Sequence, residues 1–169
     1  CILLKYHDKV EDKPVIRPYT PITHPEQKGV FEIMIKRYPK SKMGTHVHTL
    51  RPGEDIECKG PILKFDYKHG KYTHLGMIAG GTGIAPMFQL IQGILDDRAT
   101  KNKPQISLVY SNKSRNDMLL ATELAEFQKG NPKTFNLYLT LSQTAPWRWL
   151  GSVERVNKEV ILAYMPETG

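Results

Sequence analysis

One glycine-rich stretch constrains the fold of this chain more than any other part of the sequence. Residues 75–95 read LGMIAGGTGIAPMFQLIQGIL, and the mostly apolar start at residues 75–79 is typical of a buried strand. After Pro86, apolar residues recur at positions 87, 90, 91, 94 and 95, which is helical spacing. Proline is tolerated in a first helical turn, where its missing N–H has no helical partner. The stretch therefore predicts a strand, a glycine turn and a helix.

This arrangement brings backbone N–H groups and the positive end of a helix to one place, where a phosphate can bind. The glycines let the backbone approach such a ligand closely. The pattern Gly81-x-Gly83-x-x-Pro86 lacks the third Gly or Ala of the usual dinucleotide fingerprint, and no Lys-Ser or Lys-Thr follows as in a Walker loop. By itself the stretch also fits a strand-to-helix connection that binds nothing.

Composition narrows the class of protein. The chain has 169 residues, 40% hydrophobic and 24% charged, which suits one globular domain or two small ones. Its net charge of +7 favours acidic partners. We expect no nucleic-acid partner, because there is no basic run and no basic stripe with interleaved aromatic residues. No apolar run approaches the length of a membrane span.

The cysteines and histidines indicate no metal site and no disulfide framework. Cys1 and Cys58 are the two cysteines of the chain, and their spacing suits neither. A reducing, intracellular compartment is the simplest inference. His46-x-His48 resembles a metal pair, but on a helix this spacing points the two rings apart.

The first part of the chain, residues 1–68, has the pattern of β structure. Several short apolar segments separated by turn residues predict a small antiparallel β-barrel. In order, we expect strands at residues 2–6, 15–20, 30–38 and 55–59, and a short helix at 43–50. In the third strand Phe31, Ile33 and Ile35 would share one face.

The second part, residues 69–169, alternates strands and helices, which predicts a parallel α/β domain. We expect strands at 75–79, 106–110 and 135–141 and helices at 86–95, 117–127 and 153–164. Ser114 and Asp117 mark the expected start of the middle helix. The fold class is therefore an antiparallel β domain followed by a parallel α/β nucleotide-binding domain.

A second informative stretch is Arg17-Pro18-Tyr19-Thr20-Pro21. Arg can hold a phosphate with two hydrogen bonds, Tyr offers a flat face, and Thr offers a hydroxyl. Together they suit a ligand with a phosphate, a planar ring and a ring nitrogen. A proline-bounded edge strand with an ordinary surface Arg explains the same residues.

These stretches, taken in order, resemble the signatures of the NADH–cytochrome b5 reductases within the ferredoxin–NADP reductase superfamily. The resemblance covers nearly the whole chain. It is carried by Arg17-Pro18-Tyr19-Thr20, Lys42-Met43, Gly80-Gly81-Thr82-Gly83-Ile84-Ala85-Pro86, Tyr110-Ser111-Asn112, Asp117-Met118-Leu119-Leu120, Leu139-Thr140-Leu141, Ala145-Pro146 and Trp149.

The resemblance implies that the first domain binds FAD. Arg17 would pair with the FAD pyrophosphate, and Tyr19, beside Pro18, would pack on the flavin. Thr20 would hydrogen-bond near flavin N5, where a hydride arrives. Met34 and Lys36 would line the same site from the next strand.

The resemblance also implies that Lys42, Met43 and the start of the following helix hold the FAD phosphates, which suits a helix N-terminus. The family usually has Ser or Thr where this chain has Gly44. Thr45 is then the candidate replacement for that hydroxyl.

In the second domain, Gly81, Thr82, Gly83 and Pro86 would shape the crevice for the nicotinamide and the pyrophosphate of NADH. Thr82 and Thr20 are the candidate residues at the site of hydride transfer. The hydride step requires no side-chain acid or base, because the flavin supplies the chemistry.

Two departures from the family pattern concern the nucleotide site. A Thr common in the family is Ala85 here. An acidic residue typical of NADH-specific members is Ser142 here. With Arg115, Ser142 could accept a 2′-phosphate, so NADPH stays open as a donor beside NADH.

The resemblance therefore predicts a flavoprotein oxidoreductase that passes electrons from NADH through FAD to an acidic haem protein, with cytochrome b5 as the expected acceptor. The alternative is a non-catalytic relative that keeps the fold and binds FAD weakly or not at all. Because the chain begins at Cys1 and stops short of the family's Cys-Gly-Pro-Pro segment, we expect a fragment without the first barrel strands. A parent protein with a membrane anchor would lie at the endoplasmic reticulum or the mitochondrial outer membrane.

Overall fold

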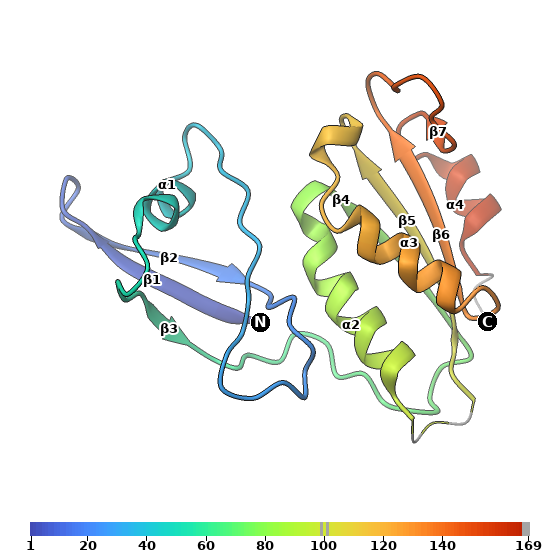
Figure 1. Ribbon diagram of the computed structural model, residues 1–169, viewed down its shortest axis with the longest axis horizontal. Coiled ribbons are helices and arrows are strands. Elements are labelled where there is room, and N and C mark those ends of the chain that lie inside the picture. The colour runs from blue at the N-terminus through green and yellow to red at the C-terminus, as the bar shows by residue number, and fades with distance from the viewer. Residues whose placement is uncertain (99, 101, 167–169) are drawn as a thin grey trace. The chain divides into compact units, whose positions relative to one another are not determined.

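The chain folds into two compact units, Cys1–Asp66 and Tyr67–Gly169. The computed structural model describes residues 1–98, 100 and 102–166 (Figure 1). The domain boundary predicted from the sequence lies between residues 68 and 69. The end of the predicted second domain, residues 167–169, lies outside the described residues.

The first unit is built on an antiparallel sheet of three strands, in the order β2-β1-β3. β1 (Ile2–Asp8) and β2 (Lys13–Tyr19) form a hairpin, and β3 (Glu57–Lys59) pairs with the other edge of β1. The antiparallel β structure predicted for this part of the chain is confirmed.

The helix α1 (Lys42–Thr49) packs on this sheet and completes a small core. The Ser41 side chain caps the helix, because its Oγ accepts a hydrogen bond from the N–H of Gly44 at 3.0 Å. Met43 of α1 is buried with Ile2, Leu4 and Val15 of the sheet.

The expected strand at residues 30–38 is wrong. Ile33 makes one isolated bridge, to Pro21, and the rest of this fully described segment is irregular. Ile33 and Ile35 do pack against the core, whereas Phe31 is exposed. The alternating pattern correctly predicted that Ile33 and Ile35 face inward but was wrong for Phe31, and no neighbouring strand pairs with this segment to form a ladder.

The second unit is a parallel sheet of four strands in the order β4-β5-β6-β7. The strands are β4 (His74–Gly80), β5 (Gln105–Asn112), β6 (Phe135–Leu141) and β7 (Ser152–Val153). The helices are α2 (Ile84–Asp96), α3 (Ala121–Gly130) and α4 (Lys158–Tyr164), with short 3₁₀ turns η1 (Gly81–Gly83) and η2 (Arg115–Asp117). The predicted parallel α/β fold is confirmed.

Helices cover both faces of this sheet. α2 and α3 lie side by side on one face (Figure 1). Between them the rings of Phe88 and Phe127 stack, with their centroids 5.2 Å apart. α4 packs on the other face, where Tyr164 stacks on Tyr138 of β6 at 3.7 Å. Because neighbouring side chains of a strand alternate between faces, Tyr110 and Asn112 of β5 belong to the α2/α3 face.

Two predicted helices are shorter than expected. The middle helix begins at Ala121 rather than near residue 117, and Leu120 before it has a positive φ of 58°. Ser114, the residue before η2, donates instead from its hydroxyl to the Asp117 carboxylate at the end of η2, at 2.7 Å. The last stretch, 153–164, is divided between β7 and α4. Among the described residues, no helix is both long and apolar enough to cross a membrane.

Candidate functional site

The glycine turn joins β4 to α2 and is open on its outer side. Gly81 has a positive φ of 50°, a conformation that favours glycine. A Cβ placed on Gly80, Gly81 or Gly83 would meet no atom within 4 Å. The turn therefore has room for a ligand next to its backbone.

The N-terminus of α2 follows directly. Ile84 is the first helical residue and Pro86 the third, so the proline lies in the first turn as predicted. Thr82 and Pro86 are exposed. A helix of 13 residues presents a partial positive charge at this end, and the site suits the phosphates of a dinucleotide.

Tyr110 of β5 holds the glycine turn in position through a hydrogen bond to its backbone. It is fully buried on β5, and its hydroxyl donates to the carbonyl oxygen of Gly81 at 3.1 Å. The same hydroxyl accepts from the N–H of Leu119, also at 3.1 Å. Tyr110 was part of the sequence resemblance, but no role was predicted for it. Its alternation with Ile106 and Leu108 was the signal that it faces inward.

Ser142 lies at the same edge of the sheet, one residue beyond β6. Its N–H donates to the carbonyl oxygen of Asn112 at 2.8 Å, which joins the ends of β5 and β6. Arg115 is exposed in η2. The ends of β4, β5 and β6 thus bring the glycine turn, Asn112 and Ser142 to the carboxyl edge, where open α/β sheets bind ligands.

In the first unit, Arg17 and Tyr19 lie near the end of β2. Arg17 is exposed, and its Nη1 donates to the carbonyl oxygen of Ile16 at 2.7 Å. Tyr19 is half-buried against the core. Burial raises the pKa of the Tyr19 phenol above its ordinary value, while the positive charge of Arg17 acts in the opposite direction.

The bridge between Pro21 and Ile33 places Thr20 close to the segment that carries Met34. Met34 and Lys36 are half-buried, and Pro18 is exposed. The Lys36 ammonium lies 5.9 Å from the ring centre of Tyr38. The predicted FAD-site residues of this unit are therefore close to the surface, but Met34 and Lys36 come from an irregular segment and not from a strand.

The start of α1 forms the other part of the predicted FAD site. A shallow hollow there is lined by Tyr6, Pro39, Lys40, Ser41, Lys42, Thr45 and His46. The first N–H groups of a helix have no acceptor within the helix. Here the N–H of Gly44 donates to the side-chain oxygen of Ser41. The N–H groups of Lys42 and Met43 are the remaining donors for a phosphate, although the Met43 side chain itself is in the core.

The absence of a side chain at Gly44 leaves space for the Ser41 side chain that caps α1. A Cβ on Gly44 would lie 2.8 Å from the Oγ of Ser41. Ser41 therefore occupies the space that a Ser or Thr at position 44 would need, and it presents a hydroxyl at the start of the helix. Sequence reasoning considered Thr45 for this purpose and missed Ser41.

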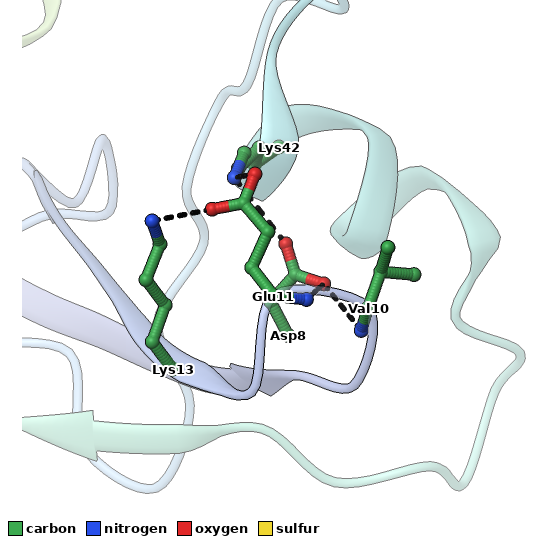
Figure 2. Close-up of polar contacts among 5 residues, drawn as sticks. All are labelled: Asp8, Val10, Glu11, Lys13 and Lys42. Atoms are coloured by element: carbon green, nitrogen blue, oxygen red, sulfur yellow. Dashed lines mark hydrogen bonds and ion pairs between the residues drawn. The ribbon is translucent and has the colours of Figure 1, made fainter.

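Figure 2 shows an ionic cluster that ties the β1–β2 turn to the start of α1. The Lys42 ammonium pairs with Glu11 and lies 3.5 Å from Asp8, and Lys13 pairs with Glu11 at 2.5 Å. Hydrogen bonds from Lys13 and then Lys42 lower the pKa of Glu11 to about 2. The hydrogen bond with Glu11 raises the pKa of Lys42. Sequence reasoning missed Glu11, because a contact between a turn and a distant helix leaves no local pattern.

The two histidines of α1 have separate partners. The ring of His46 stacks on Tyr6 with a centroid distance of 3.9 Å, and His48 Nε2 lies 2.9 Å from the carbonyl oxygen of Ile35. Within the described part of the chain, no three His, Cys, Asp or Glu residues form a group that could hold a metal ion.

Comparison with known proteins connects these features to a family. The oxidoreductase FAD-binding domain matches residues 2–67, and the oxidoreductase NAD-binding domain matches residues 77–168. The chain is 42% identical over 170 residues to an NADH-cytochrome b5 reductase-like protein of Arabidopsis thaliana, covering 98% of this chain and 51% of the relative. It is 37% identical over 167 residues to NADH-cytochrome b5 reductase 2 of Pyricularia oryzae, covering 99% of this chain and 50% of the relative.

The chain belongs to the NADH–cytochrome b5 reductase family. It spans about half the length of these curated relatives. The cytochrome b5 reductase domain of Ulva prolifera nitrate reductase superimposes with a TM-score of 0.87 at 26% identity, covering 99% of this chain and 69% of that one. The FAD/NAD-binding domain of a Vibrio cholerae nitric oxide dioxygenase shares the fold, with a TM-score of 0.73 at 16% identity, covering 94% of this chain and 65% of that one. Both an FAD-binding and an NAD-binding domain match this chain, in agreement with the two types of cofactor predicted from its sequence.

Proposed function

We propose that this protein accepts a hydride from NADH on a bound FAD and passes electrons one at a time to cytochrome b5. The observation that carries the proposal is the order of the two domains along one chain. Each domain has an exposed residue among its predicted binding residues, Arg17 in the first and Thr82 in the second. The curated relatives are named for this activity.

FAD supplies the redox chemistry, because a flavin accepts a hydride and can release single electrons. The protein's own residues bind and orient the two cofactors. In the first unit, Arg17 and the N–H groups at the start of α1 would hold the diphosphate of FAD. Tyr19 offers a flat, half-buried ring for the flavin, and the Thr20 hydroxyl offers a hydrogen bond.

In the second unit, the open glycine turn and the N-terminus of α2 would hold the diphosphate of the nicotinamide nucleotide. Ser142 at the end of β6 would lie near the adenosine ribose. A serine there carries no negative charge to repel a 2′-phosphate, so NADPH is a second donor within the proposal.

The acceptor is part of the proposal. A net charge of +7 favours the approach of an acidic protein such as a cytochrome b5, and steering of this kind weakens as salt is added. The relatives that share this chain's sequence are named as reductases of cytochrome b5. A membrane anchor in the parent protein would hold such a reductase near a membrane-bound acceptor.

The test is optical. Purified protein that is yellow, loses its flavin absorbance on anaerobic addition of NADH and then reduces added cytochrome b5 supports the proposal. Colourless protein that is unchanged by added FAD favours a non-catalytic relative and contradicts the proposal. Flavin that NADH reduces but cytochrome b5 does not reoxidise leaves the cofactor assignment in place and rejects the acceptor.

A further inference from the structure

Asn112, the last residue of β5, has a buried side chain without a hydrogen-bond partner. It is 5% exposed, and neither its Oδ1 nor its Nδ2 has a partner in the described part of the chain. Buried polar groups are rarely left unpaired, because losing water without a replacement is unfavourable. The other buried polar side chain of this sheet, Thr140, does have a partner, since its Oγ1 donates to the Glu154 carbonyl oxygen at 2.5 Å.

The position of Asn112 links it to the nucleotide site. Its side chain belongs to the same sheet face as Tyr110, whose hydroxyl contacts the glycine turn at Gly81. Its backbone carbonyl accepts from the N–H of Ser142. Asn112 therefore lies between the glycine turn and Ser142, at the carboxyl edge of the sheet.

The chemistry of the unpaired atoms indicates which group of the nucleotide can bind them. An amide offers both a donor and an acceptor, whereas a phosphate has only acceptors and would leave Oδ1 unpaired. Sugar hydroxyls both donate and accept. Between a diphosphate at the glycine turn and an adenosine end at Ser142, the group in reach is the adenosine ribose.

We propose that Asn112 binds the hydroxyls of the adenosine ribose of the nicotinamide nucleotide; this rests on the nucleotide site proposed above. Because both amide atoms are shielded from solvent, the ligand reaches them when the adjoining connection, residues 113–120, shifts. That connection contains the turn η2 and the positive-φ residue Leu120. Asn112 is thus a ligand-binding residue whose hydrogen bonds form only in the complex.

The test compares Asn112→Leu with Asn112→Asp in the flavin-loaded protein. Leu removes both unpaired atoms, so we expect a thermal midpoint without nucleotide that is equal to or above that of the wild type, together with about tenfold weaker binding of NAD+. Asp buries a charge but can accept two bonds from a ribose, so we expect a lower midpoint with NAD+ affinity within about threefold of the wild type. Binding of nicotinamide mononucleotide, which lacks the adenosine half, should be equal in all three proteins.

The matched control is Gln92→Leu, because Gln92 on α2 also has a buried, unpaired oxygen but lies away from the carboxyl edge. It should change the thermal midpoint without changing NAD+ affinity. Wild-type NAD+ affinity in Asn112→Leu overturns the inference, and so does a loss of affinity that follows the thermal midpoint in both Asn112 variants. If either result is found while NADH still removes the flavin absorbance of the wild-type protein, the proposed function stands and this inference alone fails.

Discussion

The hydroxyl of Tyr110 donates to the carbonyl oxygen of Gly81 at 3.1 Å, so a fully buried ring on β5 holds the glycine turn at the end of β4. The same hydroxyl accepts from the N–H of Leu119, just before α3. One oxygen atom therefore connects both helix starts on this face of the sheet. A site that must keep a backbone turn in position for a ligand depends on such support.

Tyr110→Phe removes this hydroxyl and keeps the packed ring. We expect the free energy of unfolding to fall by about 1–3 kcal/mol, because the Gly81 carbonyl and the Leu119 N–H are left without this partner. We also expect weaker NAD+ binding, since the glycine turn loses its support. Chemical denaturation and NAD+ titration of the flavin-loaded protein measure the two effects.

Tyr138→Phe is the matched control. Its hydroxyl donates to Glu154 at 2.9 Å on the opposite face of the sheet, away from the glycine turn. This variant should lose stability and keep its NAD+ affinity. Equal losses of NAD+ affinity in both variants would show that Tyr110 acts through general stability only.

Ser142→Asp should shift donor preference towards NADH. A carboxylate at the end of β6 repels a 2′-phosphate and can accept hydrogen bonds from ribose hydroxyls. We expect the ratio of kcat/KM for NADH to that for NADPH to rise by about tenfold or more, the effect of one unfavourable charge contact of about 1.4 kcal/mol. Steady-state rates with the two donors measure this ratio, and Ser142→Asn controls for side-chain size. An unchanged ratio in the Asp variant would remove Ser142 from the site.

Much of the second unit could be predicted from the sequence, because its signals are local. An apolar strand, three glycines and an early proline define β4, η1 and the start of α2 without reference to the rest of the chain. The start of α3 could not be predicted in the same way. Ser114 and Asp117 have the spacing of a capping pair, but their hydrogen bond closes η2, and a positive φ at Leu120 delays the helix to Ala121.

The first unit shows the opposite case. The segment 30–38 alternates as a strand does, and its inward-facing residues Ile33 and Ile35 pack against the core. A strand also needs a partner along its length, and this segment has a single bridge. The pairing of Glu11 with Lys42 depends on a turn meeting a helix that lies 31 residues away in the chain. Such tertiary contacts leave no periodicity in the sequence, so neither Glu11 nor the Ser41 cap was predicted.

Arg17→Ala should weaken retention of FAD, because a charge partner for the diphosphate is lost. We expect about tenfold faster loss of flavin on dialysis, since hydrogen bonds to charged groups contribute roughly 1.5–3 kcal/mol. Stability without flavin should change little, because Arg17 is exposed. Flavin absorbance per protein measures retention. Lys59→Ala, which removes an exposed cation from β3 of the same sheet, is the control, and flavin content equal to that control would rule out the role of Arg17.

Glu11→Gln should make the thermal midpoint of the protein less dependent on pH in the acid range. The pKa of Glu11 is lowered in the folded protein from 4.5 to about 2, so its carboxylate binds protons more weakly when folded than when unfolded. The resulting stabilisation is fully present above pH 4.5 and is lost as the pH falls towards 2. We expect the wild-type thermal midpoint to fall more steeply than that of the variant across this window. Because the cluster is exposed to solvent, added salt should reduce the difference.

Glu26→Gln makes the same change of charge elsewhere in the first unit and should leave the wild-type acid profile in place. In the flavin-loaded protein, Glu11→Gln should retain FAD at least as well as the wild type, because the Lys42 ammonium loses a carboxylate that competes with phosphate. Parallel acid profiles for the wild type and Glu11→Gln would mean that the cluster of Figure 2 does not stabilise the fold. Weaker flavin retention in this variant would instead mean that Glu11 helps FAD binding by positioning Lys42.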